Sequence, residues 1–268
     1  MNKKYLDIKE IQKEELNILK ETINFLNENS IKYYIFYGTL LGAVRHNGFI
    51  PWDDDIDIII PRPEYEKLIN ILKNKNNKIN GKNIEAIGYE VGVSDWPFIK
   101  IVNKDIKLED ELNCDEKLWI DVFPLDGASD KENKHYKKVL KLRNLYWFMR
   151  YDIKKIPIGK VNGIRKILKK IILFFYKIYG YNRVIESYIK CCKQYDYNKS
   201  EYITDNIWGD GKLIFKKSLL EDKSMEFDEL EVNGVKNYDE MLTIMYGDYK
   251  KLPPEEERVS HSIKAYRK

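Results

Sequence analysis

No run of 18 consecutive apolar residues occurs in the 268-residue sequence, so we expect no helix that spans a membrane. The first residues also lack the apolar core that a signal peptide carries. Cysteine is scarce: there are 3, an odd number, and their spacing is not that of a zinc site. These absences favour a reduced, cytoplasmic protein without structural disulfides.

Charge of both signs is plentiful but unevenly distributed. The formal net charge is +4, yet residues 131–193 alone hold 18 Lys or Arg and 3 Asp or Glu, a local net of +15. The rest of the chain is therefore acidic overall. This asymmetry indicates a basic part that meets an anionic partner and an acidic part that is suited to a metal ion.

Apolar periodicity and turn residues outline the expected elements. Helical spacing predicts helices at 7–29, 40–45, 64–73 and 238–246, and a longer helical region at 131–197. Runs of β-forming residues predict strands at 33–37, 56–60, 84–93, 98–103 and 118–123. We therefore predict an α+β (mixed α/β) fold with a mixed sheet, and short irregular pieces in the tail. Three parts are expected: a catalytic core with an N-terminal helix at 1–128, a basic helical region at 129–200, and a segment at 201–268 that packs back on the core.

Residues 53–57 read Asp-Asp-Asp-Ile-Asp and are the most informative stretch of the chain. Four carboxylates in five residues repel one another, and a hard divalent cation is the natural group to neutralise them. In a strand, alternate side chains share a face, so Asp55 and Asp57 point together while Ile56 and Ile58 point away. The alternative is a solvated acidic turn, which the apolar β-forming residues that follow make less favourable.

Asp121 is the best candidate for a third carboxylate. It lies among bulky apolar residues in the segment 119–123, where an Asp is costly unless it is paired or bound to a metal. The alternative is an edge-strand Asp that faces water, and the nearby Asp126 is interpreted as a turn residue. Two acids on one strand and one on its neighbour can hold one or two Mg²⁺ ions, or Mn²⁺, which stabilise the charge that develops in phosphoryl transfer.

The turn Tyr37-Gly38-Thr39 directly precedes the short expected helix. Free backbone N–H groups and the helix dipole suit such a place to a phosphate group. Thr39 can also cap the helix and offer a hydroxyl. Most Gly-Thr pairs are ordinary caps, so this prediction depends on the short connection to the acidic stretch.

Residues 37–58 read YGTLLGAVRHNGFIPWDDDIDI. This segment closely resembles the LicD family of phosphocholine transferases and their relatives, whose core the fukutin-type transferases share. Further segments that match the family lie at 64–65, 120–127, 246–249 and 252–254. The resemblance implies a nucleotidyltransferase-like core, related to the polymerase β superfamily. In that pattern Gly38, Asp55, Asp57 and Asp121 occupy the expected positions, and Thr39 stands where Ser is usual.

The resemblance implies a reaction and roles for the acids. The family transfers phosphocholine from CDP-choline, or a related group from its CDP donor, to a glycan hydroxyl and releases CMP. Carried over, Asp55 and Asp57 bind Mg²⁺ directly, and Asp121 completes the metal site and deprotonates the acceptor hydroxyl. Asp53 is in phase with them and is a further metal ligand or a support for the ligands. The implied acceptor is a glycan of the lipopolysaccharide, teichoic acid or capsule type.

The donor's diphosphate and head group need other partners. Arg45 and Lys100 are predicted to pair with the diphosphate, although the alternative for Lys100 is an exposed strand lysine. A choline head group is held by aromatic faces, and we favour Trp52 and Trp208 for this role. The wider set of available rings is Trp96, Trp119, Tyr246 and Tyr249. The same site could serve ethanolamine, or a polyol phosphate that needs no aromatic cage.

Residues 160–179 alternate Lys/Arg with apolar and aromatic residues at helical spacing. This pattern is typical of a helix on an anionic membrane surface, and it suits an acceptor glycan that is linked to a lipid at the inner face of the membrane. The alternative is a helix with its apolar face in the core and its lysines in solvent.

Three other functional classes are less favoured. A glycosyltransferase with an Asp-x-Asp motif needs a longer nucleotide-binding half than the 52 residues before this one. A nucleic-acid binding module is disfavoured because the basic segment has no recognition motif, so we expect no nucleic-acid partner. An inactive scaffold is disfavoured because Asp55, Asp57 and Asp121 are all present.

Overall fold

The computed structural model describes residues 4–79, 83–109, 116–129, 135–153, 171, 174, 178–209, 213–260 and 263–267. The first half contains α1 (Ile8–Glu28), β1 (Tyr34–Ile35), α2 (Tyr37–His46), β2 (Asp57–Pro61), α3 (Arg62–Asn74), β3 (Ile84–Ile87), β4 (Ile99–Leu108) and β5 (Lys117–Ala128). The second half contains α4 (Tyr136–Ile153), α6 (Tyr181–Cys192), β6 (Tyr202–Thr204), β7 (Ile214–Lys216), β8 (Asp222–Phe227), β9 (Leu230–Val235), α7 (Tyr238–Tyr246) and β10 (Ala265–Arg267). Two short 3₁₀ turns lie at Lys217–Leu219 and Glu255–Glu257.

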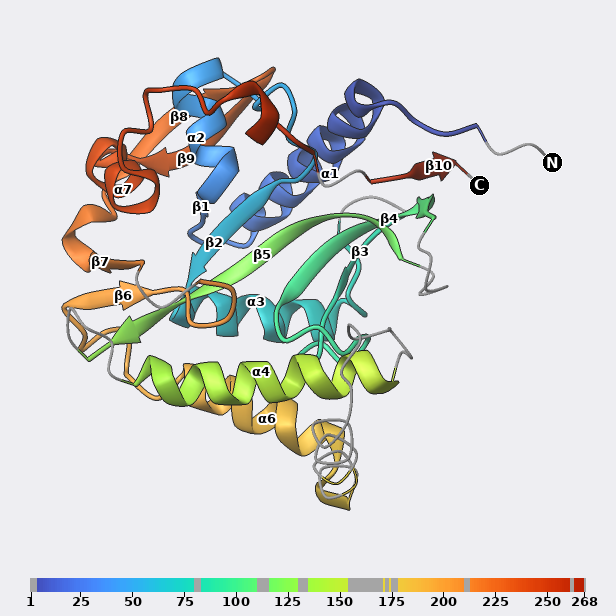
Figure 1. Cartoon of the computed structure of the whole chain (residues 1–268), viewed down its shortest axis with the longest axis vertical. Helices are drawn as coiled ribbons and strands as arrows, with labels where there is room; N and C mark the ends of the chain where they lie inside the picture. Colours follow the sequence, from blue (N-terminus) through green and yellow to red (C-terminus); the bar gives the residue numbers. More distant parts are fainter. Residues whose placement is uncertain are drawn as a thin grey trace.

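A mixed sheet forms the centre of the protein (Figure 1). Its strand order is β1-β2-β5-β4-β10; β3 also pairs with β4, and β6 joins β5 to β7. β2 and β5 run parallel, whereas the other pairings are antiparallel. A central parallel strand is buried on both faces, which explains the apolar run Ile58–Ile60 in β2. The predicted α+β fold with a mixed sheet is confirmed.

Helices and a hairpin surround this sheet. Figure 1 shows α4 and α6 side by side on one side of it, while α2, α7 and the β8–β9 hairpin gather near β1. α1 begins with a capping box: the Asp7 carboxylate accepts from the Glu10 N–H, and the Glu10 side chain accepts from the Asp7 N–H. The apolar face of α1, including Ile18 and Leu19, is buried in the core.

Several expected elements are confirmed and others differ. The helices expected at 7–29, 64–73 and 238–246 are α1, α3 and α7. The helix expected at 40–45 already begins at Tyr37, so Gly38 and Thr39 lie in its first turn and not ahead of it. The strand expected at 84–93 ends at Ile87, because residues 88–93 form a turn: the Val93 N–H donates to the Gly88 carbonyl at 3.2 Å, and Gly92 adopts a φ of +80°.

The expected irregular tail is wrong for residues 222–235, which form the β8–β9 hairpin. Residues 154–170, with the break expected at 156–159, lie outside the described residues. The C-terminal segment joins the main sheet through β6, β7 and β10. The division into three parts stays a prediction.

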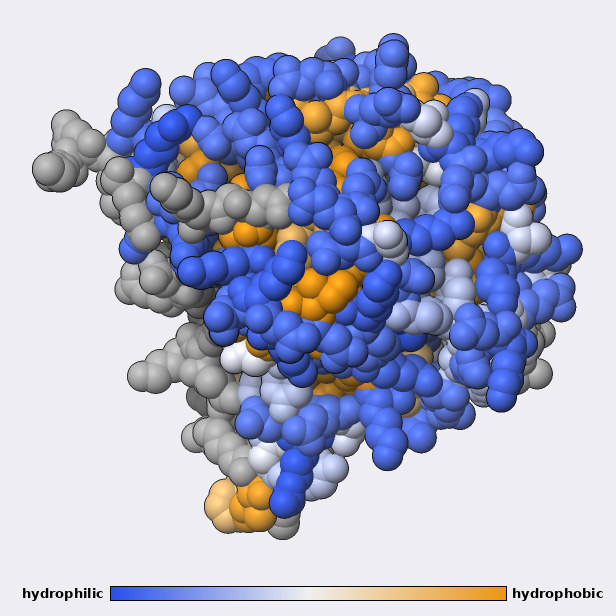
Figure 2. Space-filling view, turned by 180° about the vertical axis from the view of Figure 1, so that it is seen from behind, coloured by the Kyte–Doolittle hydropathy of each residue, from blue (hydrophilic) through white to orange (hydrophobic). Residues whose placement is uncertain are grey.

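The surface seen in Figure 2 is mostly hydrophilic, with separate hydrophobic patches. Within the described ranges, none of the helices is both long and apolar enough to cross a bilayer. Cys191 and Cys192 are buried free thiols, and Cys114 lies outside the described residues.

Candidate functional site

Acidic residues from two segments of the chain meet at neighbouring strands of the sheet. Asp57 on β2 and Asp121 on β5 are direct partners in the parallel register of these strands. The Asp121 N–H donates to the Ile56 carbonyl at 2.9 Å, which fixes this register where β2 begins. Because opposite residues of paired strands project to the same face, the two carboxylates share one face of the sheet.

Negative charge accumulates around Asp57. Burial raises the pKa of the Asp57 carboxyl well above its ordinary value, and the charges of Asp55, Asp121 and Asp53 raise it further. The ammonium of Lys100 acts in the opposite direction. Four acids therefore lie within electrostatic range of one another, and an additional positive charge would stabilise the group.

The two acids that open the stretch lie in different surroundings. The Asp53 carbonyl accepts a hydrogen bond from Gln12 Nε2 at 2.7 Å, so this part of the loop is held against α1. Asp54 is buried, and its Oδ2 accepts from the Ile263 N–H at 3.3 Å. Asp54 thus fastens the C-terminal segment, whereas Asp53 contributes to the charge around Asp57.

The start of α2 is closely fitted to the acidic stretch. A Cβ atom added to Gly38 would lie 2.7 Å from Asp53 Oδ2, so only glycine allows this approach. Thr39 Oγ1 accepts a hydrogen bond of 2.8 Å from the Asp57 N–H. Tyr37 has a φ of +46°, a strained value for a residue with a side chain. The first turn of α2 is therefore held directly beside Asp53 and Asp57.

Lys100 contacts Asp121 and is buried, so the alternative of an exposed strand lysine is wrong. Its side chain extends from β4 opposite Asp121, and Nζ lies 3.1 Å from Asp121 Oδ1. The ammonium sits 3.8 Å from the ring centroid of Trp119 and 4.2 Å from that of Trp96. Two indole faces and one carboxylate therefore hold the charge of Lys100.

Arg45 and Trp52 lie against the C-terminal segment. Arg45 Nη1 donates to the carbonyls of Tyr249 at 3.1 Å and Lys251 at 3.3 Å. The guanidinium of Arg258 lies 5.3 Å from the ring centroid of Trp52. One cation already faces this indole, so Trp52 has less free surface for a head group than its sequence position suggests.

Trp208 has a half-exposed side chain and an aromatic support. The residue is 50% exposed, and its ring stacks on Phe123, with centroids 6.0 Å apart and planes inclined by 19°. Phe123 follows Asp121 by two residues on β5, so it projects to the same face of the sheet as that acid. The structure therefore places Trp208 over the strand that carries Asp121.

Asp205 connects Trp208 to the start of α2. The N–H groups of Ile207 and Trp208 donate to Asp205 Oδ1 at 2.8 and 2.9 Å, and the Tyr37 hydroxyl donates to Oδ2 at 2.9 Å. Burial raises the pKa of the Asp205 carboxyl to about 6, although these three hydrogen bonds lower it. Asp205 thereby fixes both the loop that bears Trp208 and the ring of Tyr37.

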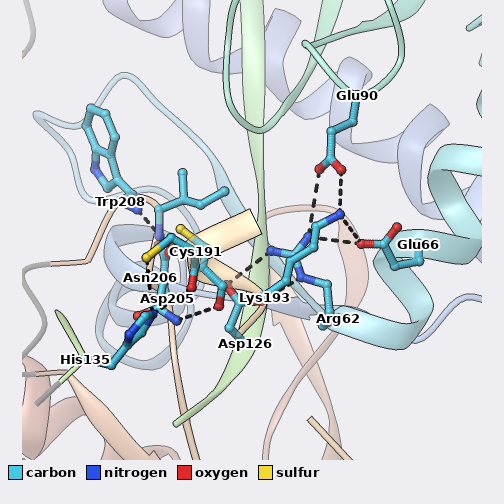
Figure 3. A network of polar contacts seen from close by, with 12 residues as sticks. Arg62, Glu66, Glu90, Asp126, His135, Cys191, Lys193, Asp205, Asn206 and Trp208 are labelled. Atoms are coloured by element: carbon cyan, nitrogen blue, oxygen red, sulfur yellow. Dashed lines mark hydrogen bonds and ion pairs between the residues drawn. The ribbon is translucent and has the colours of Figure 1, made fainter. Parts of the chain in front are cut away.

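Asp126 is wrongly interpreted as a turn residue. It lies within β5, is fully buried, and accepts from Arg62 Nε at 2.6 Å and Nη2 at 3.2 Å. Figure 3 shows this pair continuing through Glu66 and Glu90 to Lys193, whose Nζ lies 2.6 Å from an oxygen of each glutamate. Burial of an unpaired carboxylate is costly, so Arg62 is what allows Asp126 to lie inside the fold. This network joins α3 to β5.

The aspartates of this region are suitable ligands for a hard cation, although their side chains do not already converge on a common metal position. Across the described ranges, no three His, Cys, Asp or Glu side chains converge as metal ligands. Carboxylate oxygens are nevertheless the donors that Mg²⁺ prefers. Asp121 Oδ1 is buried and makes no hydrogen bond within the described part of the chain, apart from its ion pair with Lys100. The charge and the donor chemistry are therefore those of a cation site.

Three further residues belong to this region, and sequence reasoning gave none of them a definite role there. Glu15 of α1 is four residues from both Ile11 and Leu19, so the helical period could have shown an acid at a core position. Tyr246 of α7 is 44% exposed as a residue, but desolvation of its hydroxyl and the nearby charges of Asp57, Asp53 and Asp55 raise the pKa of that group. Asp205 follows an ordinary short strand, and no sequence signal distinguishes it from a turn residue.

The fold and this site define an α+β protein whose central sheet presents acids on two parallel strands, beside the first turn of a helix. A family model described as "LicD/FKTN/FKRP, nucleotidyltransferase domain" matches residues 30–162. The lipopolysaccharide cholinephosphotransferase LicD of Haemophilus influenzae is 29% identical over 97% of this chain and 97% of its own length. The chain belongs to the LicD family.

Two relatives from Rickettsia share shorter stretches with the chain. An uncharacterized protein of Rickettsia typhi is 32% identical over 54% of this chain and 43% of its own length. An uncharacterized protein of Rickettsia prowazekii is 45% identical over 28% of this chain and 24% of its own length. These partial matches carry no functional assignment.

Proposed function

We propose that the protein is a Mg²⁺-dependent transferase that moves phosphocholine from CDP-choline to a hydroxyl group of a cell-surface glycan and releases CMP. Family membership and the name of the Haemophilus relative support this activity. The observation that carries the proposal is the pairing of Asp57 with Asp121 across two parallel strands. We further propose that the core is nucleotidyltransferase-like, with Gly38, Asp55, Asp57 and Asp121 in the positions of that superfamily's pattern.

Asp55, Asp57 and Asp121 would hold the cation, with Asp53 as a further ligand or support. When bound, Mg²⁺ neutralises phosphate oxygens and stabilises the charge of the transition state. Thr39 holds the backbone of Asp57, and Lys100 holds the carboxylate of Asp121. Asp121 also remains the candidate base for the acceptor hydroxyl, since Lys100 keeps its carboxylate oriented on the face of the sheet that bears Asp57.

Trp208 is the best-placed ring for the choline head group. It is half exposed, stacks on Phe123, and lies over the strand of Asp121. A quaternary ammonium is held by aromatic faces, whereas a polyol gains little from them. Arg45 is the candidate for the diphosphate: it lies in the last turn of α2, and its charge acts on Tyr246, on which Asp53, Asp55 and Asp57 also act.

A peripheral membrane contact through residues 160–179 is part of the proposal, and most of that segment lies outside the described residues. Four described residues within it, however, are exposed and largely apolar: Ile171, Phe174, Ile178 and Tyr179. Figure 2 shows hydrophobic side chains at the lower tip of the molecule. Exposed apolar side chains in a segment whose sequence is rich in lysine suit an anionic lipid surface. Flotation with anionic and with neutral vesicles tests this contact, and equal absence of binding to both would contradict it.

Donor use distinguishes the proposed reaction from its relatives. We would measure CMP release from CDP-choline, CDP-ethanolamine and CDP-ribitol in the presence of a glycan acceptor, with Mg²⁺, with Mn²⁺ and with EDTA. The proposal expects release from CDP-choline that requires the cation and fails in Asp57→Asn. Release from CDP-ribitol alone would identify a polyol phosphate transferase, and release that is unchanged by EDTA would overturn the cation requirement.

A further inference from the structure

Glu15 on α1 is a buried acid without a partner. Its side chain is 1% exposed, and neither carboxylate oxygen has a hydrogen-bond partner among the described residues. Taking a carboxylate out of water without a partner carries a large free-energy penalty. The other buried polar side chains of the helix do have partners: Gln12 donates to the acidic loop and Thr22 donates to the Ile18 carbonyl. Glu15 is thus the exception on this face of α1.

The position of Glu15 explains why an acid is kept there. Gln12 binds the carbonyls of Asp53 and Ile50 at 2.7 and 3.4 Å, so this turn of α1 lies on the acidic loop. Glu15 is three residues further along and therefore on the same side of the helix. The carboxylates that act on it are, in order, those of Asp55, Asp54, Asp53 and Asp121. Glu15 adds a fifth acid behind the site, and it comes from an element that lies before the matched region 30–162.

A purely structural role does not account for this residue. Most of the core positions of α1 are apolar, among them Ile11, Ile18 and Leu19. An apolar residue or a glutamine at position 15 would fill the same space without a charge. A carboxylate at this place is favourable only if a positive charge reaches the acids that surround it.

We propose that Glu15 is a further acidic group of the cation site, which strengthens the binding of a divalent cation from beneath the Asp53–Asp55 loop. This inference rests on the proposed function, because it assumes a cation at Asp55, Asp57 and Asp121. It assigns a binding role to α1, whereas the sequence motif assigns such a role only to the acidic loop, β2 and β5. The ligand class is a hard divalent cation, Mg²⁺ or its probe Mn²⁺.

The test measures Mn²⁺ binding directly, by the electron paramagnetic resonance signal of free Mn²⁺, and needs no substrate. Glu15→Gln keeps the size of the side chain and removes its charge, and Glu28→Gln makes the same change at the exposed end of the same helix. We expect Glu15→Gln to weaken Mn²⁺ binding about tenfold and Glu28→Gln to leave it unchanged. Without cation, Glu15→Gln should unfold at a higher temperature than the wild type, because a buried acid without a hydrogen-bond partner, placed among other acids, is gone. Glu15→Met is the second variant if glutamine prevents folding.

The outcomes separate this inference from the proposed function. If Asp57→Asn abolishes Mn²⁺ binding while Glu15→Gln binds as tightly as the wild type, the role of Glu15 is refuted and the proposed site stands. If the wild type itself binds no Mn²⁺, the proposed cation requirement falls, and the role of Glu15 falls with it.

Discussion

The Thr39 hydroxyl accepts a hydrogen bond of 2.8 Å from the backbone N–H of Asp57, and so joins the first turn of α2 to the first residue of β2. Thr39 therefore holds the backbone at the start of β2, whether or not it also contacts a phosphate. The hydroxyl hydrogen stays available to donate, because this bond uses the oxygen as an acceptor.

Replacing Thr39 separates these two roles. Thr39→Val keeps the shape of the side chain but leaves the Asp57 N–H without its acceptor, so we expect unfolding to become easier by about 1–3 kcal/mol. Thr39→Ser restores the acceptor and should restore stability. Urea unfolding gives the free energies, and CMP release gives activity. Equal stability of the valine and serine variants would contradict the role of this bond.

Lys100→Met should be strongly destabilising. Methionine fills the space between Trp96 and Trp119 but leaves Asp121 without its ammonium, and breaking a buried ion pair costs about 3 kcal/mol. Denaturant unfolding of Lys100→Met, compared with that of Lys104→Met on the same strand, measures the effect. Lys104 is the matched control because its ion pair with Glu85 is more exposed. A loss below about 1 kcal/mol at Lys100 would show that the pair is dispensable.

Two glycines of α2 should respond differently to alanine. At Gly42 the added Cβ would lie 2.4 Å from the Gly48 carbonyl oxygen, which is backbone, so we expect Gly42→Ala to cost about 2 kcal/mol or more. At Gly38 the new atom meets the Asp53 carboxylate, which can move, so Gly38→Ala should lower activity more than stability. Melting temperatures and CMP release of both variants test this contrast. A larger loss of stability in Gly38→Ala than in Gly42→Ala would contradict the prediction.

Asp205 should make the protein less stable as pH rises from about 4 to about 6. Burial raises the pKa of its carboxyl from 3.8 to about 6, so in this window the folded protein binds more protons than the unfolded chain. The stability that the protonated group contributes is complete below pH 3.8 and is lost as pH rises through about 6, a change of about 3 kcal/mol.

Asp205→Asn removes this titration, so the difference in unfolding free energy between variant and wild type should shift by about 3 kcal/mol in favour of the variant between pH 4 and pH 7. Asp248→Asn, at an exposed site, controls for the loss of one charge. A difference between Asp205→Asn and the wild type that does not change with pH would show that Asp205 does not titrate in this range.

Trp208→Ala should discriminate between donors. Loss of a cation–π contact costs about 0.5–2 kcal/mol, so we expect KM for CDP-choline to rise about 2- to 30-fold while KM for CDP-ribitol changes little. Trp208→Phe keeps an aromatic face and should recover most of the affinity. If Trp208→Ala raises KM equally for both donors, Trp208 does not bind the choline head group.

The central acids were predictable, because their pattern is local. Alternation in the stretch 53–57 and an acid within an apolar strand placed Asp57 and Asp121 on neighbouring strands, and the structure makes them register partners. Lys100 could not be placed from sequence, since its burial depends on Trp96 and Trp119, which approach it only once the sheet has formed. The same holds for Asp126, whose partner Arg62 is remote in sequence.

The β8–β9 hairpin shows a different limit. Its turn runs through Asp228 and Glu229, without the Asn-Gly or Asp-Gly pair that marks tight hairpins. Asp228 nevertheless adopts a φ of +50°, and its carboxylate approaches Gly48 and accepts from the Phe49 N–H at 3.4 Å. The residues of this turn do not favour it by themselves, and the same aspartate that adopts the unusual φ also contacts the loop after α2.

The strand that carries Lys100 also illustrates protection against aggregation. On the side of β4 away from β5, β3 pairs with residues 100–103 and β10 pairs with residues 106–108. An unpaired strand edge offers a template on which another chain can add, and two short strands from distant parts of the sequence cover most of this one. Loss of β10 would expose backbone donors and acceptors of β4, so the last strand of the chain helps to keep separate molecules apart.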